Sequence, residues 1–448
     1  MTPFPISENT PITYAGPQPK ETDVIVIGGG VIGVCTAFFL AQDDKRVVLL
    51  EKGRIAGEQS SRNWGWIRQQ GRDPDEIPIM AEAKKIWQDF ASKTNSDIGL
   101  TTAGVTYLAQ NNAEMESFNE WMQHAKAHNL DSKILSSSDV SDLIPDMHAD
   151  YVGGIHTASD MRAEPWLAVP ALAEIAKRSG ATLIENCAAR SLDISAGRVS
   201  GVITEAGLIK SPEVILAGGA WSSLFLQNMG IYLPQLSVRA TVAATAPLPV
   251  VQMGGVADQN FAFRRRTDGG YSIASGRLNK LFIGPDAFRA FPKFLTQLRA
   301  DPFGISLSPA APKGFPDAWT TPRAWNSDEF SPFEKMRVLN PGPDLKKIQK
   351  IRNRFESLFP HLGRIELKSS WAGMIDTMPD LVPIMDRATT IPGLTVGTGF
   401  SGHGFGIGPA AGRILAALST GHKTGHDLTR FRLSRFSDGS KMQLGPAI

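Results

Sequence analysis

Cysteine is scarce in this chain, with two residues, Cys35 and Cys187, among 448. So few cysteines exclude a disulfide scaffold, and we expect both to be buried as small apolar side chains. The chain also lacks an excess of either charge, because its formal net charge is +2 and basic and acidic residues are interspersed. We therefore expect no nucleic-acid partner. A metal site is not expected either.

A membrane-spanning segment and a signal peptide are also not expected. The stretch from Val24 to Ala41 is uncharged over 18 residues, which a hydropathy scan would report as a candidate span. Its three consecutive glycines and its change from a strand-like to a helix-like pattern contradict that interpretation. Residues 1–22 contain prolines and acids instead of a basic start and an apolar core. They predict a loosely ordered arm and a cytoplasmic protein.

A glycine turn is the strongest local motif. The sequence DVIVIGGGVIG, Asp23 to Gly33, places glycines between an apolar β-branched run and a helix-like stretch. In such a turn the glycines permit the bend, the approach of a pyrophosphate and close helix–strand packing, while the helix N-terminus faces the phosphate charge. The predicted contacts are Gly28, Gly30, Val31, Ile32 and Gly33.

The segment after this turn supports a nucleotide site. The next strand, Arg46 to Leu50, ends in Glu51, where a carboxylate can bind a ribose hydroxyl. Strand, turn, helix, strand and acid thus occur in the order typical of dinucleotide binding. NAD and FAD remain alternatives at this point.

Two further glycine turns follow apolar strands far along the chain. The first is in EVILAGGAW, from Glu213, and the second is in LTVGTGFSGHGFGIGPAAG, from Leu394. A simple NAD-binding unit needs one such turn, whereas FAD is longer and is contacted by distant segments. The three turns together favour FAD.

The length predicts two domains, which can be interleaved in sequence, because 448 residues exceed one ordinary core. Apolar spacing predicts helices over 79–92 and 113–128 and a helix that ends at Gly180, and short strands are expected near residues 104–110, 188–194, 198–205 and 207–211. Residues 231–366 are rich in Pro, Phe and Arg and show little periodicity.

Several motifs carry a family resemblance. The glycine turn with Glu51, the loop GEQSSRNWGW, the strand VILAGGAW and the segment GFSGHGFGIGPAAG resemble the glycine oxidase, sarcosine oxidase and D-amino-acid oxidase superfamily of FAD enzymes. The segments EKGRIAGEQSSR, NCAARSL, IKSPEVILAGGAWSSLFLQN and SPFEK resemble membrane-associated L-amino acid deaminases. The resemblance runs from about Asp23 to Arg432.

The resemblance implies an α/β fold, α+β overall, in which a discontinuous two-dinucleotide-fold FAD-binding domain joins a substrate domain whose antiparallel sheet roofs the flavin. The expected division is an arm at 1–22, the FAD-binding domain at 23–100, 161–230 and 367–432, the substrate domain at 101–160 and 231–366, and a tail at 433–448.

The resemblance also implies an activity. An amino acid would lose a hydride to the flavin N5, and the resulting imino acid would hydrolyse to a 2-oxo acid and ammonia. Oxidation of a D-amino acid or of a sarcosine-like secondary amine is an alternative, and a flavin-carrying subunit of a heteromeric dehydrogenase is another. Oxygen or a quinone would reoxidise the flavin.

The cofactor contacts implied by the resemblance come from the three turns and the loop after Glu51. That loop contains neither His nor Cys, the usual attachment residues, so we expect non-covalent FAD. The further predicted contacts are Glu51, Lys52, Gln59, Ser60, Ser61, Arg62, Ala189, Ala217, Gly218, Gly219, Trp221, Trp371, Gly402, His403, Gly404, Phe405 and Gly406.

A substrate carboxylate requires a cation, and Arg264 aligns with the arginine that binds it in the deaminases. A guanidinium suits this role because it donates two parallel hydrogen bonds to a carboxylate. The alternative is a solvated strand end, in which alternation would put Arg264 and Arg266 on one face and Arg265 on the other. Arg68, at roughly the place of a sarcosine-oxidase arginine, is a second candidate.

The predicted pocket also includes Trp66, Gln69 and Tyr271. The chain departs from its relatives at Asn63 to Trp66, where deaminases carry small polar residues and a glutamine. It departs again at Gly406, where sarcosine oxidases carry a lysine for the substrate carboxylate. Because this lysine is absent, Arg264 or Arg68 would have to bind the substrate carboxylate.

A last segment, Asp286 to Arg299, has the pattern of an interfacial helix. Its aromatic and leucine side chains can share one helical face with basic residues beside it, although Pro292 lies within it. We expect either peripheral membrane contact on the cytoplasmic face or a lid that packs on the protein itself.

Overall fold

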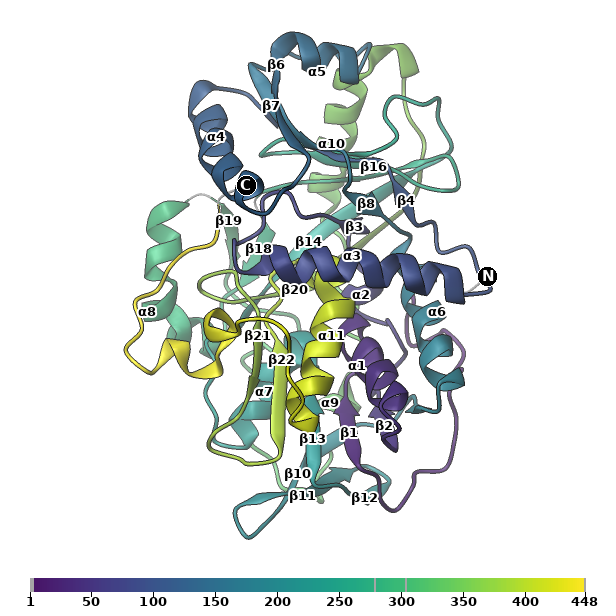
Figure 1. Cartoon of the computed structure of the whole chain (residues 1–448), viewed down its shortest axis with the longest axis vertical. Coiled ribbons are helices and arrows are strands. Elements are labelled where there is room, and N and C mark those ends of the chain that lie inside the picture. Colours follow the sequence, from purple (N-terminus) through teal and green to yellow (C-terminus); the bar gives the residue numbers. More distant parts are fainter. Residues whose placement is uncertain (1–3, 278, 303, 447–448) are drawn as a thin grey trace.

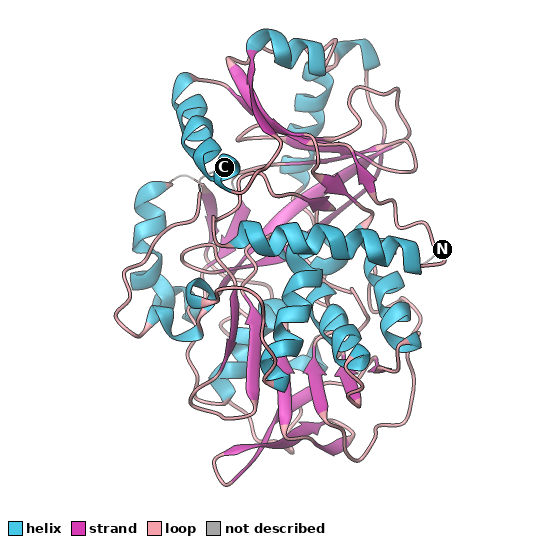
Figure 2. Ribbon diagram, viewed as in Figure 1, coloured by secondary structure: helices cyan, strands magenta, loops and turns pink. Residues whose placement is uncertain are grey.

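The computed structural model describes residues 4–277, 279–302 and 304–446. Two large sheets organise the chain, a six-stranded one in the lower part of the view and a ten-stranded one above it (Figure 1). Helices cover both sheets, and long loops connect them (Figure 2). The expected mixed α/β fold with a large antiparallel sheet is confirmed.

The six-stranded sheet has the order β21-β22-β13-β1-β2-β9, and all neighbouring strands are parallel except β21 and β22. Its central strands are apolar and buried along their length, as a parallel sheet covered on both faces requires. The bounds are β21 Ile384–Arg387, β22 Leu394–Thr398, β13 Glu213–Leu216, β1 Val24–Ile27, β2 Val47–Leu50 and β9 Thr182–Ile184.

Two long helices pack closely against each other beside this sheet (Figure 1). They are α1 (Val31–Gln42) and α11 (Gly404–Thr420). A Cβ atom on Gly412 would lie 2.5 Å from the Cβ atom of Cys35, so a glycine is needed there for the helices to approach. Cys35 and Cys187 are both free and buried, as expected.

The ten-stranded sheet has the order β19-β18-β14-β17-β16-β15-β5-β7-β6, with β20 paired to β14. Helices α4 (Asn112–Ala127), α5 (Ser137–Leu143) and α10 (Leu345–Leu358) lie in the same upper part of the molecule (Figure 1). The strands are β19 Ile305–Ser308, β18 Asn279–Phe282, β14 Leu236–Thr245, β17 Tyr271–Ala274, β16 Ala262–Arg265, β15 Gly255–Ala257, β5 Val105–Ala109, β7 Gly153–Thr157, β6 Ser132–Ser136 and β20 Leu367–Thr377.

Smaller elements complete the chain. One three-stranded sheet joins β10 (Ala189–Ser195), β11 (Arg198–Thr204) and β12 (Gly207–Lys210), and another joins β3 (Trp66–Ile67), β8 (Met161–Arg162) and β4 (Thr101–Thr102). The remaining helices are α2 Gln59–Arg62, α3 Glu76–Lys93, α6 Pro165–Arg178, α7 Ser222–Asn228, α8 Pro285–Ala300 and α9 Pro332–Lys335. Short 3-10 helices are η1 Gly219–Trp221, η2 Pro360–Leu362, η3 Thr429–Phe431 and η4 Leu433–Phe436.

The expected helices are present with small shifts at their ends. The helix predicted from residue 79 begins three residues earlier, at Glu76. The apolar pattern did not show this start, because Glu76 is charged and yet fully buried. The expectation of a loosely ordered N-terminal arm is wrong, because several side chains of the arm pack against the rest of the protein. Ile6 and Tyr14 are buried, and the ring of Phe4 lies 4.5 Å from that of Trp371. These three apolar side chains hold the arm against the protein.

Helix α8 forms as expected and carries Pro292 inside it. Its apolar residues do not share one environment, however. Phe294 and Ala290 are buried, whereas Phe288 and Phe291 are 66% and 53% exposed. None of the described helices is long and apolar enough to cross a membrane.

Candidate active site

The first glycine turn joins β1 to α1 with very little space. Gly28 has φ +111°, and a Cβ atom on it would lie 2.4 Å from the carbonyl oxygen of Ala217. A Cβ atom on Gly33 would lie 1.9 Å from the carbonyl oxygen of Gly28. The first turn of α1 contains no acidic residue, and its N-cap residue, Gly30, has no side chain to cap it. Ser60 Oγ accepts a hydrogen bond from the backbone N–H of Val31 at 2.9 Å. The positive end of the helix thus has no anionic partner within the described part of the chain and suits an external anion.

Glu51 lies at the end of β2, where its buried carboxylate accepts hydrogen bonds from the backbone N–H groups of Gly29 and Gly53, both at 2.7 Å. Burial raises the pKa of Glu51 to about 7, and the charge of Lys52 acts in the opposite direction. The two backbone donors fix the carboxylate at the position where a ribose hydroxyl would approach.

All three glycine turns line one cleft. β13 leads into the second turn at Gly218, and β22 leads into the third glycine turn, residues 399–406. The predicted contacts that line the cleft are Gly28, Gly30, Val31, Ile32, Glu51, Lys52, Gln59, Ser60, Ala189, Ala217, Gly218, Gly219, Trp221, Gly402, Gly404 and Phe405. Further lining residues not anticipated from the sequence are Gly29, Arg54, Glu58, Phe333, Met374, Asp376 and Phe400.

Glu58 connects the walls of this cleft. Its carboxylate accepts hydrogen bonds from Lys52 Nζ at 2.7 Å, from Trp221 Nε1 at 3.1 Å and from the backbone of Leu339 at 2.9 Å. Glu58 lies within the GEQSSR segment quoted above, so that motif could have identified Glu58 as a residue of the cleft. Phe333 lies within the quoted SPFEK segment, so that resemblance was a comparable signal, although it did not show that the side chain lines the cleft.

Six predicted cofactor contacts do not line the cleft: Gly33, Ser61, Arg62, Trp371, His403 and Gly406. The guanidinium of Arg62 donates to the carbonyl oxygens of Ile6 at 2.9 Å and Ala372 at 3.0 Å, and so connects the N-terminal arm to β20. Trp371 Nε1 donates to the carbonyl oxygen of Arg62 at 3.0 Å. In this structure both side chains support the cleft from behind, and their direct contact with a cofactor stays a prediction.

His403 precedes α11 in the third glycine turn and pairs with a buried acid. Its Nδ1 lies 3.0 Å from a carboxylate oxygen of Glu76, which is fully buried at the start of α3. Burial lowers the pKa of His403 to about 4, and the charges of Arg72 and Arg68 act in the same direction. The imidazole is therefore neutral near pH 7 and donates its Nδ1 proton to Glu76.

The predicted carboxylate ligand Arg264 already has a full set of partners. Its Nη1 and Nη2 atoms donate to Glu164 at 2.9 and 2.7 Å, and its Nε donates to the carbonyl oxygen of Trp64. Arg265 donates to the hydroxyl of Tyr271, whereas Arg266 donates to the carbonyl oxygen of Tyr271 and pairs with Asp268 at 2.8 Å. The three arginines thus do not act as one group.

Tyr271 and Gln69 also form hydrogen bonds with other residues of the protein. The Tyr271 hydroxyl accepts from the backbone of Val251 at 2.9 Å, and its side chain is fully buried in the sheet. Gln69 Oε1 accepts from Lys84 Nζ at 2.8 Å. Their predicted role in the substrate pocket is not tested by these contacts and stays a prediction.

Trp66 and Arg68 extend from β3 towards the ten-stranded sheet. A Cβ atom on Gly255 in β15 would lie 2.8 Å from the Trp66 ring, and the Trp66 Nε1 has no hydrogen-bond partner among the described residues. The guanidinium of Arg68 lies 5.1 Å from the centre of the Tyr107 ring. Arg68 therefore stays a candidate for the substrate carboxylate, together with the unpartnered indole beside it.

The comparison with known families explains the three-turn cleft. Residues 23–418 match the family described as DAO, FAD dependent oxidoreductase. The chain belongs to this family. FAD is its cofactor. The three-turn cleft offers it glycines without Cβ atoms, a helix N-terminus without an acidic residue and an anchored Glu51.

Individual relatives of this oxidoreductase cover nearly its whole length. Mitochondrial sarcosine dehydrogenase of Mus musculus is 25% identical over 94% of this chain, which spans 42% of that longer protein. Sarcosine oxidase subunit beta of Rhizobium meliloti is 24% identical over 94% of this chain and 90% of its own length. The structure of L-amino acid deaminase from Proteus myxofaciens in complex with anthranilate has a TM-score of 0.89 and 30% identity, covering 95% of this chain and 96% of that chain.

Proposed function

We propose that this oxidoreductase oxidises the C–N bond of a free amino acid to an imino acid, which water converts to a 2-oxo acid and ammonia. Similarity to the Proteus L-amino acid deaminase over nearly the whole chain supports this reaction and favours L-configured substrates. The observation that carries the proposal is the buried guanidinium of Arg68 beside the third glycine turn, because that arrangement suits an anionic substrate.

When bound, FAD supplies the oxidising power by accepting the electron pair of the substrate α-carbon. The residues of the chain then have to bind the carboxylate, orient the α-carbon and accept the amine proton. Arg264 and Arg68 are the two candidates for the carboxylate. We favour Arg68, because Glu164 already occupies the guanidinium of Arg264 with two charge-assisted hydrogen bonds.

His403 suits a role in holding the third glycine turn, residues 399–406. Its pKa of about 4 makes the imidazole too weak a base to take a proton from an ammonium group. We propose that its hydrogen bond to Glu76 fixes this turn in place. Asn in place of His403 should then change FAD content or stability and leave the pH profile of kcat/KM unchanged.

Oxidation of a secondary amine is the second candidate, and similarity to sarcosine dehydrogenase and sarcosine oxidase favours it. A Cβ atom on Gly406 would lie 3.2 Å from the carbonyl oxygen of Trp66 and 3.3 Å from the Cα atom of Ile67. A lysine side chain there would have to displace backbone, so this chain needs another cation for an N-methyl amino acid. The similarity to a subunit of sarcosine oxidase also keeps a flavin-carrying subunit as an outcome of the test.

The experiment is anaerobic bleaching of the visible flavin band with L-amino acids, D-amino acids and N-methyl amino acids, followed by product analysis. We expect bleaching with L-amino acids and release of ammonia plus a 2-oxo acid. An aldehyde and a shortened amine would indicate a secondary-amine substrate. A flavin that no amine bleaches, in a protein that copurifies with another chain, would indicate the subunit role.

Two partners remain proposals. Oxygen or a quinone is proposed as the electron acceptor. Measuring the reoxidation rate of the reduced enzyme with each acceptor distinguishes them.

Peripheral membrane contact is proposed through α8, where Phe288 and Phe291 are exposed. The centre of the Phe288 ring lies 5.9 Å from that of Trp319. The neighbouring cation is Arg289, so an anionic lipid surface on the cytoplasmic face is the proposed target.

A further inference from the structure

Residues 4–14 of the N-terminal arm, which we call the anchored segment, are fixed to the protein at regular intervals. Ile6, Thr10 and Tyr14 are 2%, 7% and 7% exposed, whereas the residues at positions 8, 9 and 11–13 are exposed. Among these, Ile12 is 42% exposed. The anchored segment is therefore held at three buried points, and the stretches between these points face water.

The anchored segment packs on the loop that follows β2, residues 51–63, which we call the cleft loop. Ile6 belongs to the same buried apolar cluster as Ile55 and Ala56 of this loop. Residues 4–14 are not among the residues that line the three-turn cleft, so the anchored segment supports the loop without entering the cleft. The cleft loop itself contributes the lining residues Glu51, Lys52, Arg54, Ala56, Gly57, Glu58, Gln59, Ser60 and Asn63.

Two arginines of the cleft loop bind the backbone of the anchored segment. Arg54 Nε and Nη2 donate to the carbonyl oxygens of Thr10 and Glu8, at 2.6 and 3.0 Å. Arg62 Nη2 donates to the carbonyl oxygen of Ile6 at 2.9 Å. Arg54 lines the cleft and also binds the anchored segment, so the position of one affects the wall of the other.

Glu185, directly after β9, connects the anchored segment to the cleft loop. Its Oε2 atom accepts from the backbone N–H groups of Thr13 and Tyr14, at 2.6 and 3.1 Å. Its Oε1 atom accepts from the backbone N–H of Ile55 at 2.7 Å. Glu185 is 6% exposed, and a buried carboxylate oxygen that loses its donors costs free energy. The anchored segment and the cleft loop are therefore expected to open as one unit.

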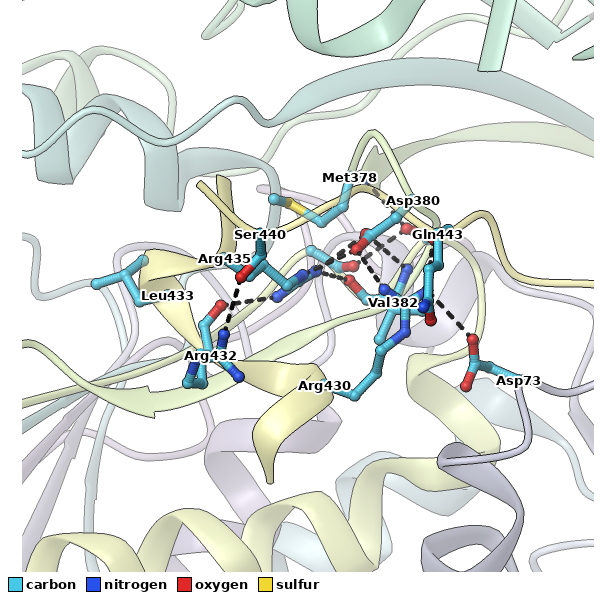
Figure 3. A network of polar contacts seen from close by, with 12 residues as sticks. Asp73, Met378, Asp380, Val382, Arg430, Arg432, Leu433, Arg435, Ser440 and Gln443 are labelled. Carbon is cyan, nitrogen blue, oxygen red and sulfur yellow. Dashed lines mark hydrogen bonds and ion pairs between the residues drawn. The ribbon is translucent and has the colours of Figure 1, made fainter. Parts of the chain in front are cut away.

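The C-terminal segment is attached in a different way and serves as a comparison. Arg430 reaches Asp73 and Asp380, at 3.3 Å each, and Arg435 donates to both carboxylate oxygens of Asp380, at 2.8 and 3.0 Å (Figure 3). These four residues are not among those that line the cleft. The C-terminal segment is thus held by ion pairs to residues outside the cleft wall, whereas the anchored segment is held by residues of the wall itself.

We propose that the anchored segment is a strap that keeps the cleft loop closed on bound FAD, and that FAD leaves the cleft when this strap is released. The proposal rests on the cofactor of the family and does not depend on which amine is oxidised. A strap that favours bound FAD must itself be held more firmly when FAD is bound, by the same factor, because the two equilibria are linked.

The first test is the rate at which FAD leaves the holoenzyme, measured by the recovery of flavin fluorescence after dilution. Ile6→Ser should increase the population of released strap, and with it the rate, at least about tenfold. This factor corresponds to about 1.4 kcal/mol, which is less than the burial of a whole isoleucine side chain contributes. Deletion of residues 2–12 should accelerate release further.

Two controls show whether the position in the chain matters. Ile12→Ser changes an exposed isoleucine of the same segment and should release FAD at the rate of the wild type. Deletion of residues 440–448, at the other end of the chain, should also leave the rate unchanged. Wild-type FAD release in both Ile6→Ser and the 2–12 deletion would overturn the proposal.

A third control separates the strap from a general loss of stability. Ile351→Ser in α10 removes an isoleucine that is 3% exposed and lies in another apolar cluster. It should lower the Tm of the holoenzyme as Ile6→Ser does, and it should leave the rate of FAD release unchanged. If Ile351→Ser accelerates FAD release as much as Ile6→Ser, the effect is general destabilisation and the proposal is wrong.

The unmodified protein provides an independent measurement. Hydrogen exchange followed by mass spectrometry reports on the backbone N–H groups of Thr13 and Tyr14, which donate to Glu185. Exchange over residues 4–14 should be slower with saturating FAD than after partial removal of FAD, whereas exchange over residues 440–446 should be the same in both samples. Equal exchange of residues 4–14 in the two samples would refute the linkage between the strap and the cofactor.

Discussion

The guanidinium of Arg264 and the carboxylate of Glu164 form a bidentate pair, with Nη1–Oε1 and Nη2–Oε2 distances of 2.9 and 2.7 Å. Both side chains are buried, at 1% and 0% exposure. Without Arg264, the buried carboxylate of Glu164 keeps only Arg162, whose Nη1 lies 3.9 Å away, and the backbone N–H of Thr267. We therefore expect Arg264→Met to lower the free energy of unfolding by about 3–5 kcal/mol, which urea denaturation of the FAD-loaded protein measures.

The double variant Arg264→Met with Glu164→Gln is the control for this prediction. It should recover much of the lost stability, because neither charge then remains in the interior. An Arg264→Met protein as stable as the wild type, with intact FAD and a large loss of kcat/KM, would contradict the structural role and support Arg264 as the substrate ligand.

Binding of FAD should depend on the missing side chain at Gly30. A Cβ atom there would lie 3.0 Å from the Oγ atom of Ser60, and it would occupy the space in which the backbone approaches the pyrophosphate. We expect Gly30→Val to be purified with little or no FAD, as judged by the cofactor released on denaturation. Gly342→Val is a matched control, since no atom lies within 4 Å of a Cβ at that position. Full FAD occupancy in Gly30→Val would contradict the assignment of the turn.

Stability should depend on pH through His403. The unfolded imidazole titrates near 6.5, whereas burial and then the charge of Arg72 lower the pKa of the folded group to about 4. Between about pH 4 and 6.5 the unfolded chain thus binds more protons than the folded protein. The free energy of unfolding rises with pH across this window, and the contribution is lost as the pH falls towards 4. In His403→Asn the urea midpoint should change less with pH than in the wild type, and identical pH dependence in both would refute the shift.

Membrane contact through α8 should depend on its exposed aromatic side chains. Phe288→Ser with Phe291→Ser should reduce sedimentation with anionic liposomes at moderate salt, because these rings are the parts of α8 that can enter the lipid interface. Phe330→Ser is the control, since Phe330 is similarly exposed, at 57%, and lies outside α8. If the wild type does not sediment with liposomes at all, α8 instead serves as a lid or as packing.

Local sequence patterns were sufficient to predict the first glycine turn and the acid after the next strand. Gly28 and Gly33 have to be glycines, because a Cβ atom at either position would overlap neighbouring backbone in the tight turn between β1 and α1. Glu51 directly follows the next strand, β2, in the same unit. These constraints act over a few residues, so the sequence alone predicts them. The helices could be predicted for the same reason, because their apolar periodicity is local.

Only the tertiary structure decided the partners of the charged residues. An arginine in sequence does not show whether an acid will meet it, and Glu164 reaches Arg264 from 100 positions away in the chain. The same fold buries Arg72 without an ion pair among the described residues, although the charges of Glu76 and Asp160 act on it. The sequence therefore determined the first glycine turn through local backbone geometry, while long-range packing determined which buried arginine is paired with an acid and which is not.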